Sequence, residues 1–253
     1  MTERARVGGA TVQWGVATHV GAVHEQNQEQ NQDSYCAKPP VFVVADGVGG
    51  HAGGEVASRV AVESMLPLVD RADVTDEMVA RCLADARERI GRISAERGRP
   101  PGTTLTGVIA TAADDVPSWL VVNIGDSRTY LLNASGLQQL SVDHSVVQQL
   151  IDVGAVEPSE AESLPMRNQL TRGLFAQRDE PADMWLLRMT PADRIMACSD
   201  GLPKEVDSST IERMLREIPD PQAVAGELVN AALDAGGRDD VTVVVVDAVA
   251  VAS

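Results

Sequence analysis

Residues 41–47 read VFVVADG, a run of five apolar residues that ends in Asp46 and Gly47. A short run rich in β-branched residues and bounded by Asp or Gly is typical of a strand. The pattern recurs at three places: Leu120–Ile124 leads into Gly125 and Asp126, Ile195–Ser199 leads into Asp200 and Gly201, and Asp239 with Asp240 opens Val241–Val246. The chain therefore predicts four strands that each carry a carboxylate at one end.

Four such strand ends predict one shared cluster of acidic oxygens. Two carboxylates about 4 Å apart repel each other by about 4 kcal/mol at an effective dielectric constant of about 20. A cluster of several carboxylates therefore requires bound cations, and hard oxygen ligands favour Mg²⁺ or Mn²⁺ over zinc or copper. The pattern alone thus predicts a hydrolase built around two or more divalent ions.

The composition limits the classes of partner. The 253 residues carry a formal net charge of −16, and the pI is about 4.6. Nucleic acids and anionic membrane surfaces both attract basic faces, so we expect neither as a partner. Aromatic residues make up only 3% of the chain, so core packing must depend on Val, Ala and Leu.

Three features predict a cytoplasmic protein. Cys36, Cys82 and Cys198 are widely spaced, which is typical of reduced, buried thiols and not of a zinc site or a disulfide framework. No stretch approaches about 18 consecutive apolar residues, as a membrane span would need. The basic N-terminus is not followed by the apolar stretch of a secretory signal.

Eight runs are predicted as strands because they are rich in β-branched residues and are bounded by Gly, Asp or Pro. They are Thr11–Thr18, Ser34–Ala37, Val41–Ala45, Thr103–Thr111, Trp119–Ile124, Arg128–Leu132, Ile195–Ser199 and Val241–Val249. Most of them come in adjacent pairs with short turns, and not in strict strand–helix alternation. This favours an α+β fold of antiparallel sheets covered by helices over a doubly wound parallel sheet.

Helices are predicted by apolar spacing and by capping residues. One begins at Glu55, and another follows Thr75 and ends near Gly98. Ser209 and Glu212 predict a capping box for a third helix. A fourth opens at Asp220-Pro221 and stops at Gly236-Gly237. Between them, Gln26–Gln32 is expected to be a polar loop, and residues 145–175 a polar insertion with short helices.

Asp-Gly after a strand is also the commonest hairpin-turn signal, so Asp46-Gly47 or Asp200-Gly201 taken alone predicts a tight turn. The two interpretations are compatible. A tight turn can present both an Asp carboxylate and a Gly carbonyl to one ion.

Seven motifs occur in a recognisable order along the chain. They are NQDS (31–34), ADGVGGH (45–51) continuing to GEVAS (54–58), GTTL (102–105), GDSR (125–128), DHS (143–145), CSDGL (198–202) and GRDDVT (237–242). Together they resemble the metal-dependent type-2C Ser/Thr protein phosphatases, and the bacterial branch in particular. The resemblance covers about residues 11–249. It implies one domain over residues 1–253, an αββα sandwich of two antiparallel sheets flanked by helices, with a flap insertion near residues 145–175.

The resemblance also implies a set of metal ligands. Asp46 would bridge two ions of Mn²⁺ or Mg²⁺, and the Gly47 carbonyl would bind one of them. Asp200 and Asp239 would complete the ligands of the first ion. Asp126 would join Asp200 in holding a third ion, as in bacterial members, and Asp33 would lie close to the second ion.

The chemistry implied by this resemblance is hydrolysis of a phosphate ester. Two divalent ions about 3.5–4 Å apart can convert water to hydroxide near neutral pH for in-line attack on phosphorus. Asp46, Asp200 and Asp239 would thereby be catalytic, and no Ser/His/Asp or Cys/His nucleophile arrangement is present. His51 either donates a proton to the leaving seryl oxygen or orders the glycine-rich loop by hydrogen bonding.

The chain departs from the family pattern where an arginine usually binds the substrate phosphate. Histidine stands at both the Asp and the Arg positions of the motif Asp-x-Gly-x-x-Arg, as His19 and His24. An imidazole lacks the bidentate fork of arginine, which removes about 1.5–3 kcal/mol of charged hydrogen bonding. His24 is therefore either a phosphate ligand or a plain loop histidine, and Arg172 or Arg238 could replace the arginine.

Three smaller departures concern Asp240, the DHS motif and the insertion. Asp240 stands where the family commonly has Asn, so its carboxylate either tightens metal binding or points away. In DHS, His144 is expected to be structural, and Asp143 could cap the helix that follows. The insertion has Leu164-Pro165 where the family usually has His-Pro, so a substrate contact is expected to be lost.

We thus expect a monomeric phosphatase that acts on phosphoserine and phosphothreonine in proteins, the targets of a Ser/Thr kinase. An anti-sigma-factor antagonist as substrate would keep the same chemistry. The alternative is a catalytically weak member that binds phosphoproteins as a regulatory module, which the missing arginine motivates.

Overall fold

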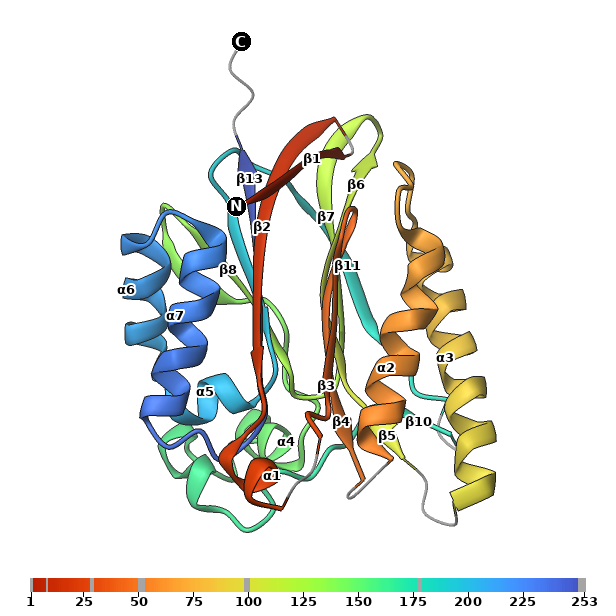
Figure 1. The fold of residues 1–253 in the computed structure, drawn as a ribbon, viewed down its shortest axis with the longest axis vertical. Helices are drawn as coiled ribbons and strands as arrows, with labels where there is room; N and C mark the ends of the chain where they lie inside the picture. Colours follow the sequence, from red (N-terminus) through yellow and green to blue (C-terminus); the bar gives the residue numbers. More distant parts are fainter. Residues whose placement is uncertain are drawn as a thin grey trace.

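Two antiparallel sheets lie face to face, and helices cover the outer face of each (Figure 1). The computed structural model describes residues 2–7, 9–27, 30–49, 53–97, 101–176 and 179–249. In strand order, the first sheet contains β1 (Glu3–Val7), β2 (Ala10–His19), β13 (Val241–Val249), β12 (Arg194–Cys198), β8 (Arg128–Asn133) and β9 (Gly136–Gln139). The second contains β10 (Leu174–Phe175), β5 (Gly102–Thr103), β4 (Val41–Val48), β6 (Leu105–Ala113), β7 (Val116–Ile124) and β11 (Asp183–Arg188), with β3 (Asp33–Lys38) paired to β4. The expected αββα sandwich is confirmed.

The helices divide between the two outer faces. Helices α2 (Gly54–Met65) and α3 (Asp76–Arg97) cover the second sheet, and α6 (Ser208–Glu217) and α7 (Pro221–Asp234) cover the first (Figure 1). Short helices α1 (Ala22–Gln26), α4 (Val146–Asp152) and α5 (Gly201–Glu205) lie at one end of the sandwich, which we call the loop end. The described residues also contain two 3₁₀ turns, at Leu66–Leu68 and Pro158–Ser163. In the described residues, no helix is both long and apolar enough to cross a membrane.

The quoted run 41–45 is apolar on both faces because β4 lies in an inner layer. Successive side chains of a strand point to opposite faces. Phe42 and Val44 join the core between the sheets, whereas Val41, Val43 and Ala45 pack under the helices. All five side chains are fully buried. Between the sheets, the rings of Trp14 and Phe42 pack with their centroids 5.4 Å apart.

Most predicted strands lie inside observed ones, with ends shifted by a few residues. The run 103–111 is divided at Thr104 into β5 and β6. Strands β1, β9, β10 and β11 were not predicted. Strand β11 reads DMWLLR, which contains no β-branched residue, and it lies at the sheet edge with Leu186 exposed. The three cysteines are free and buried, as expected.

Three local predictions were wrong. Asp46-Gly47 is not a turn, because β4 continues to Val48 and the positive φ occurs at Gly49. Asp200-Gly201 is not a hairpin turn, because Asp200 precedes helix α5. The cap of α6 is Asp207, whose side chain accepts from two backbone N–H groups, so the predicted capping box of Ser209 and Glu212 is not formed.

Candidate metal centre

Five aspartates far apart in the sequence meet at the loop end of the sandwich. They are supplied by five segments: Asp33 begins β3, Asp46 lies on β4, Asp126 follows β7, Asp200 follows β12, and Asp239 precedes β13. Asp33 and Asp46 are directly opposite each other in the β3–β4 ladder. Burial raises the pKa of Asp46 well above its usual value, and the charges of the other four aspartates raise it further. The structure therefore brings together the acids that the sequence predicted to cluster.

Glycines let the loops that carry these acids approach one another. A Cβ atom on Gly21 would overlap the backbone of Asp239, and one on Gly201 would overlap the backbone carbonyl of Asp240. The backbone N–H of Ala22 also donates to the Gly237 carbonyl, over 2.7 Å. Any larger residue at Gly21 or Gly201 would force the backbone at Asp239 or Asp240 to shift.

Burial disfavours the charged forms of Asp33 and Asp126 more than their hydrogen bonds favour them. Burial raises the pKa of Asp33 to about 7 and that of Asp126 to about 8. Asp33 Oδ2 accepts from Ser199 Oγ over 2.7 Å. Within the described residues, Asp33 Oδ1 and Asp200 Oδ1 are buried with no hydrogen-bond partner. Buried, unpaired anionic oxygens are unfavourable, so these atoms fit a site for cations.

The donor set fits hard divalent ions. In the part of the chain that the structure describes, no group of three or more His, Cys, Asp and Glu side chains is arranged to hold a metal ion. Mg²⁺ does not need such a group, because it usually keeps several waters and takes only one or two carboxylates from the protein. Two such pairs are present: Asp33 and Asp46 face each other in the β3–β4 ladder, and Asp200 and Asp239 both contact the Lys204 ammonium.

A lysine lies among these acids. The Lys204 Nζ atom is 2.5 Å from Asp200 Oδ2 and 3.0 Å from Asp239 Oδ2. Burial lowers the pKa of Lys204, but the charges of Asp200 and Asp239 outweigh this and raise it overall. The sequence analysis did not single out Lys204, although its position four residues after Asp200 was a usable signal.

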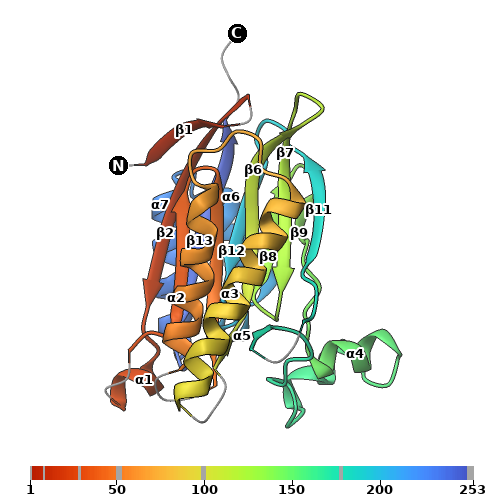
Figure 2. The same cartoon turned by 90° about the vertical axis from the view of Figure 1, so that its right-hand side faces the viewer.

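Two cavities adjoin the acids and share a wall. One, of about 140 Å³, is lined by Asp126 and Asp200, and the other, of about 560 Å³, is lined by His24 and Asp239. Arg167, Asn168 and Lys204 line both. Arg167 and Asn168 come from the insertion, which projects from the sandwich together with α4 (Figure 2). Both belong to the segment predicted as the flap, but neither was predicted to line the cleft.

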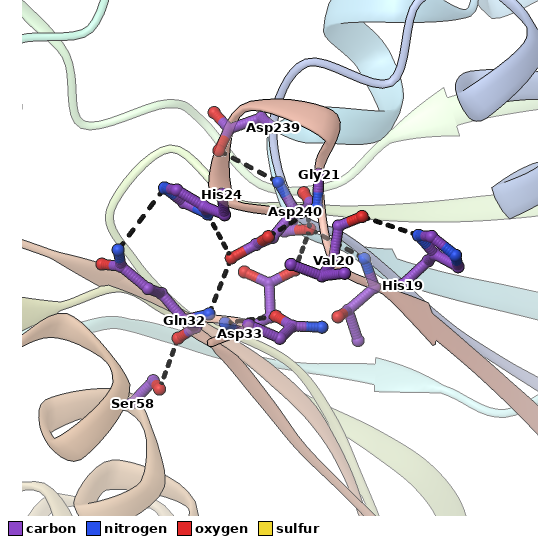
Figure 3. A network of polar contacts seen from close by, with 12 residues as sticks. His19, Val20, Gly21, His24, Gln32, Asp33, Ser58, Asp239 and Asp240 are labelled. Carbon is purple, nitrogen blue, oxygen red and sulfur yellow. Dashed lines mark hydrogen bonds and ion pairs between the residues drawn. The ribbon is translucent and has the colours of Figure 1, made fainter. Parts of the chain in front are cut away.

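Asp240 holds two loops together. Its Oδ1 atom accepts from the Gly21 N–H over 2.7 Å, and its Oδ2 atom accepts from the Gln32 N–H over 2.6 Å. The His24 Nδ1 atom lies 2.9 Å from Asp240 Oδ2 (Figure 3). Of the two alternatives for Asp240, the geometry favours the one in which it points away from the ions. His24 lines the larger cavity, but its ring is held by Asp240.

The arginine candidates are engaged elsewhere. The Arg172 guanidinium donates to Asp183 over 2.7 Å, and Arg172 does not line either cavity. The side chain of Arg238 is 74% exposed and donates to Glu205 over 2.9 Å, at the wall of the larger cavity. His51 lies outside the described residues.

His144 is structural, as expected, and it fixes the turn that carries Asp126. Its Nδ1 atom accepts from the Gly125 N–H over 3.1 Å, so Nε2 is the atom that donates to Asp183. The predicted cap at Asp143 is wrong: Ser145 caps α4, and Asp143 instead accepts from Arg128 over 2.7 Å.

Comparison with known proteins gives three concordant results. The family model described as "Protein phosphatase 2C" matches residues 20–235. The Ser/Thr protein phosphatase PstP of Mycobacterium tuberculosis is 38% identical over 224 residues, which are 87% of this chain and 42% of that protein. The chain thus spans less than half the length of that relative. The Ser/Thr phosphatase stp of Listeria innocua is 30% identical over 91% of this chain and 93% of its own length.

A solved structure extends the likeness to three dimensions. The structure of the catalytic domain of PstP, which contains two manganese ions, superposes with a TM-score of 0.84. The two chains are 31% identical, and the match covers 94% of this chain and 99% of that one.

Proposed function

Because the chain belongs to the protein phosphatase 2C family, we propose that it is a Ser/Thr protein phosphatase that hydrolyses phosphoserine and phosphothreonine in proteins. We further propose that residues 1–253 form a single domain with its core at about residues 11–249. The family is metal-dependent, and the relative with two bound manganese ions supports Mn²⁺ or Mg²⁺ as the cofactor.

The meeting of five partly buried aspartates at the loop end is the observation that carries this proposal. Asp46 and the Gly47 carbonyl would hold two ions, Asp200 and Asp239 would complete the first, and Asp126 with Asp200 would hold a third. Asp33 would lie close to the second ion. When bound, such ions supply a water whose pKa is lowered toward neutrality and offset the charge that develops on the phosphoryl oxygens.

In this proposal, the positive charge that binds the substrate phosphate does not come from the position at which the family has its arginine. His24 is held by Asp240, and Arg172 is held by Asp183. Arg167 lines both cavities beside the acids, so it replaces the missing arginine in this proposal. A guanidinium binds phosphate oxygens in a bidentate manner, and its position on the insertion would orient the phosphoprotein. The role of His51, as proton donor or as a loop-ordering residue, stays a prediction.

A second candidate function is a regulatory module that binds phosphoproteins with little turnover. The contacts of both His24 ring nitrogens favour it: Nδ1 lies against Asp240, and Nε2 lies 3.4 Å from the Gln32 side-chain nitrogen, so the usual arginine position offers no free donor to a phosphate. For either function we propose a cytoplasmic monomer whose partners are targets of a Ser/Thr kinase.

A phosphatase assay separates the two candidates. Peptides with phosphoserine, phosphothreonine or phosphotyrosine are incubated with the protein in Mn²⁺, in Mg²⁺ and in EDTA. We expect release of phosphate from the first two peptides with either metal and none in EDTA. Asp239→Ala should abolish turnover, and Asp234→Ala, on the exposed end of α7, serves as the control. Absence of turnover at every metal concentration, with retained peptide binding, would favour the module.

A further inference from the structure

We propose that Lys204 is a resident cation of this site: its ammonium holds Asp200 and Asp239 together in the metal-free protein, and it must leave when a divalent ion binds them. Lys204 would thereby set the affinity for metal. This inference rests on the metal assignment of the proposed function.

The position of the ammonium carries the argument. The Nζ atom lies 2.5 Å from Asp200 Oδ2 and 3.0 Å from Asp239 Oδ2, so it bridges carboxylates that are 39 positions apart in the sequence. An Mg²⁺ ion that takes the same two oxygens would lie about 2.0–2.1 Å from each. One point between two oxygens cannot hold an ion and an ammonium at once, so binding of one displaces the other.

This contact differs from an ordinary surface ion pair. Exposed i,i+4 pairs contribute little, because water competes for both charges. Here the Asp200 side chain is only 16% exposed. The Lys204 backbone N–H donates to the Asp200 carbonyl over 3.1 Å, so the first turn of α5 fixes both residues in one place. The lysine therefore offsets the charge of the less exposed acid, whereas its own side chain is 33% exposed and that of Asp239 is 43% exposed.

The structure also provides a place for the displaced side chain. Lys204 lines both cavities beside the acids, together with Arg167 and Asn168. The flexible four-carbon stem lets the ammonium move while the helix stays in place. Metal binding would thus transfer a positive charge from the acids to the cleft wall, where a phosphate would enter.

Calorimetry of Mn²⁺ binding, without substrate, tests the exchange. Lys204→Met should bind Mn²⁺ at least about tenfold more tightly than the wild type, because a charged hydrogen bond no longer has to be broken. The chain has only one other lysine, the exposed Lys38, so Lys38→Met is a control with the same change in net charge. Lys38→Met should bind as the wild type does. Equal or weaker binding by Lys204→Met would overturn the proposal.

Thermal unfolding adds a second measurement on the same variants. In EDTA, Lys204→Met should unfold at a lower temperature than Lys38→Met, because Asp200 and Asp239 lose their counter-ion. Saturating Mn²⁺ should remove that difference. If the two variants have the same unfolding temperature in EDTA, Lys204 does not hold the acids together and the proposal fails.

Labelling of the wild type avoids any folding defect of a variant. An amine-reactive reagent followed by mass spectrometry reports Lys204 against the internal reference Lys38. Saturating Mn²⁺ should increase the labelling of Lys204 several-fold and leave Lys38 unchanged, whereas unchanged labelling of both would contradict displacement. Failure of the wild type to bind Mn²⁺ at all would overturn the metal assignment itself, whereas binding that is insensitive to Lys204 would overturn only this inference.

Discussion

At the scale of single residues, the aspartates of the metal centre lower the stability of the folded state. Asp46 is partly buried beside four other aspartates, and both its burial and their charges raise its pKa. A buried carboxylate without a cation is unfavourable in the folded state. The same carboxylate is what a divalent ion requires. Stability and activity therefore place opposite demands on Asp46.

Asp46→Asn tests this opposition. We expect turnover to fall at least about 100-fold, because even indirect loss of metal-ligand geometry costs about that much. The unfolding temperature in EDTA should rise, because a repelled carboxylate is replaced by a neutral group of the same shape. Asp234→Asn is the matched control on an exposed position. A variant that is inactive and also less stable in EDTA would show that Asp46 is a structural residue.

At the scale of elements, Asp240 joins the α1 segment and the start of β3 to the loop before β13. It accepts the backbone N–H groups of Gly21 and Gln32 and contacts His24. Each buried N–H that loses its acceptor costs about 1–3 kcal/mol. This anchoring explains why a carboxylate, with two acceptor atoms, fits here better than an amide.

Asp240→Ala should therefore lower the free energy of unfolding by about 2–6 kcal/mol, since two backbone donors lose their acceptor. Asp240→Asn should lose roughly half of that, because its one carbonyl oxygen still accepts one N–H group. Urea unfolding in EDTA measures both variants. Equal stability of wild type and Asp240→Ala would mean that water replaces the carboxylate, and the anchoring role would be wrong.

The elements also show what the sequence can and cannot predict. Runs such as 41–45 predict their strand because burial on both faces leaves a continuous apolar signal. Strand β11 has no such signal, because its place at the sheet edge leaves Leu186 exposed and requires no β-branched residue. The aspartates of the metal centre could be predicted, because each of them lies in a recognisable motif. The partners of Lys204 and Asp240 depend on loops that meet only in the folded chain, so neither contact could be read from spacing.

At the scale of the whole molecule, the acid cluster predicts a pH dependence of stability in the metal-free protein. Asp33 and Asp126 have folded pKa values of about 7 and about 8, both above the usual value of 3.8. The folded state then binds more protons than the unfolded state between about pH 4 and pH 8, so stability falls as pH rises through that window.

Unfolding temperatures measured in EDTA should therefore decrease from pH 5 to pH 8. In saturating Mn²⁺ the decrease should become small or reverse, because ions bind the deprotonated carboxylates. Asp126→Asn should reduce the slope in EDTA, and an unchanged slope in that variant would show that other groups cause it.

The insertion leaves and rejoins the sandwich at a single neck. The His144 N–H donates to the Gly125 carbonyl, the Thr171 N–H donates to the His144 carbonyl, and Ser145 pairs with Leu170. Residues 146–169 thus form a lobe closed at its base, one position away from Asp126. The base of this lobe, and not its tip, is hydrogen-bonded to the turn that carries Asp126. Sequence changes at the tip can therefore alter partner choice while the hydrolytic machinery stays the same.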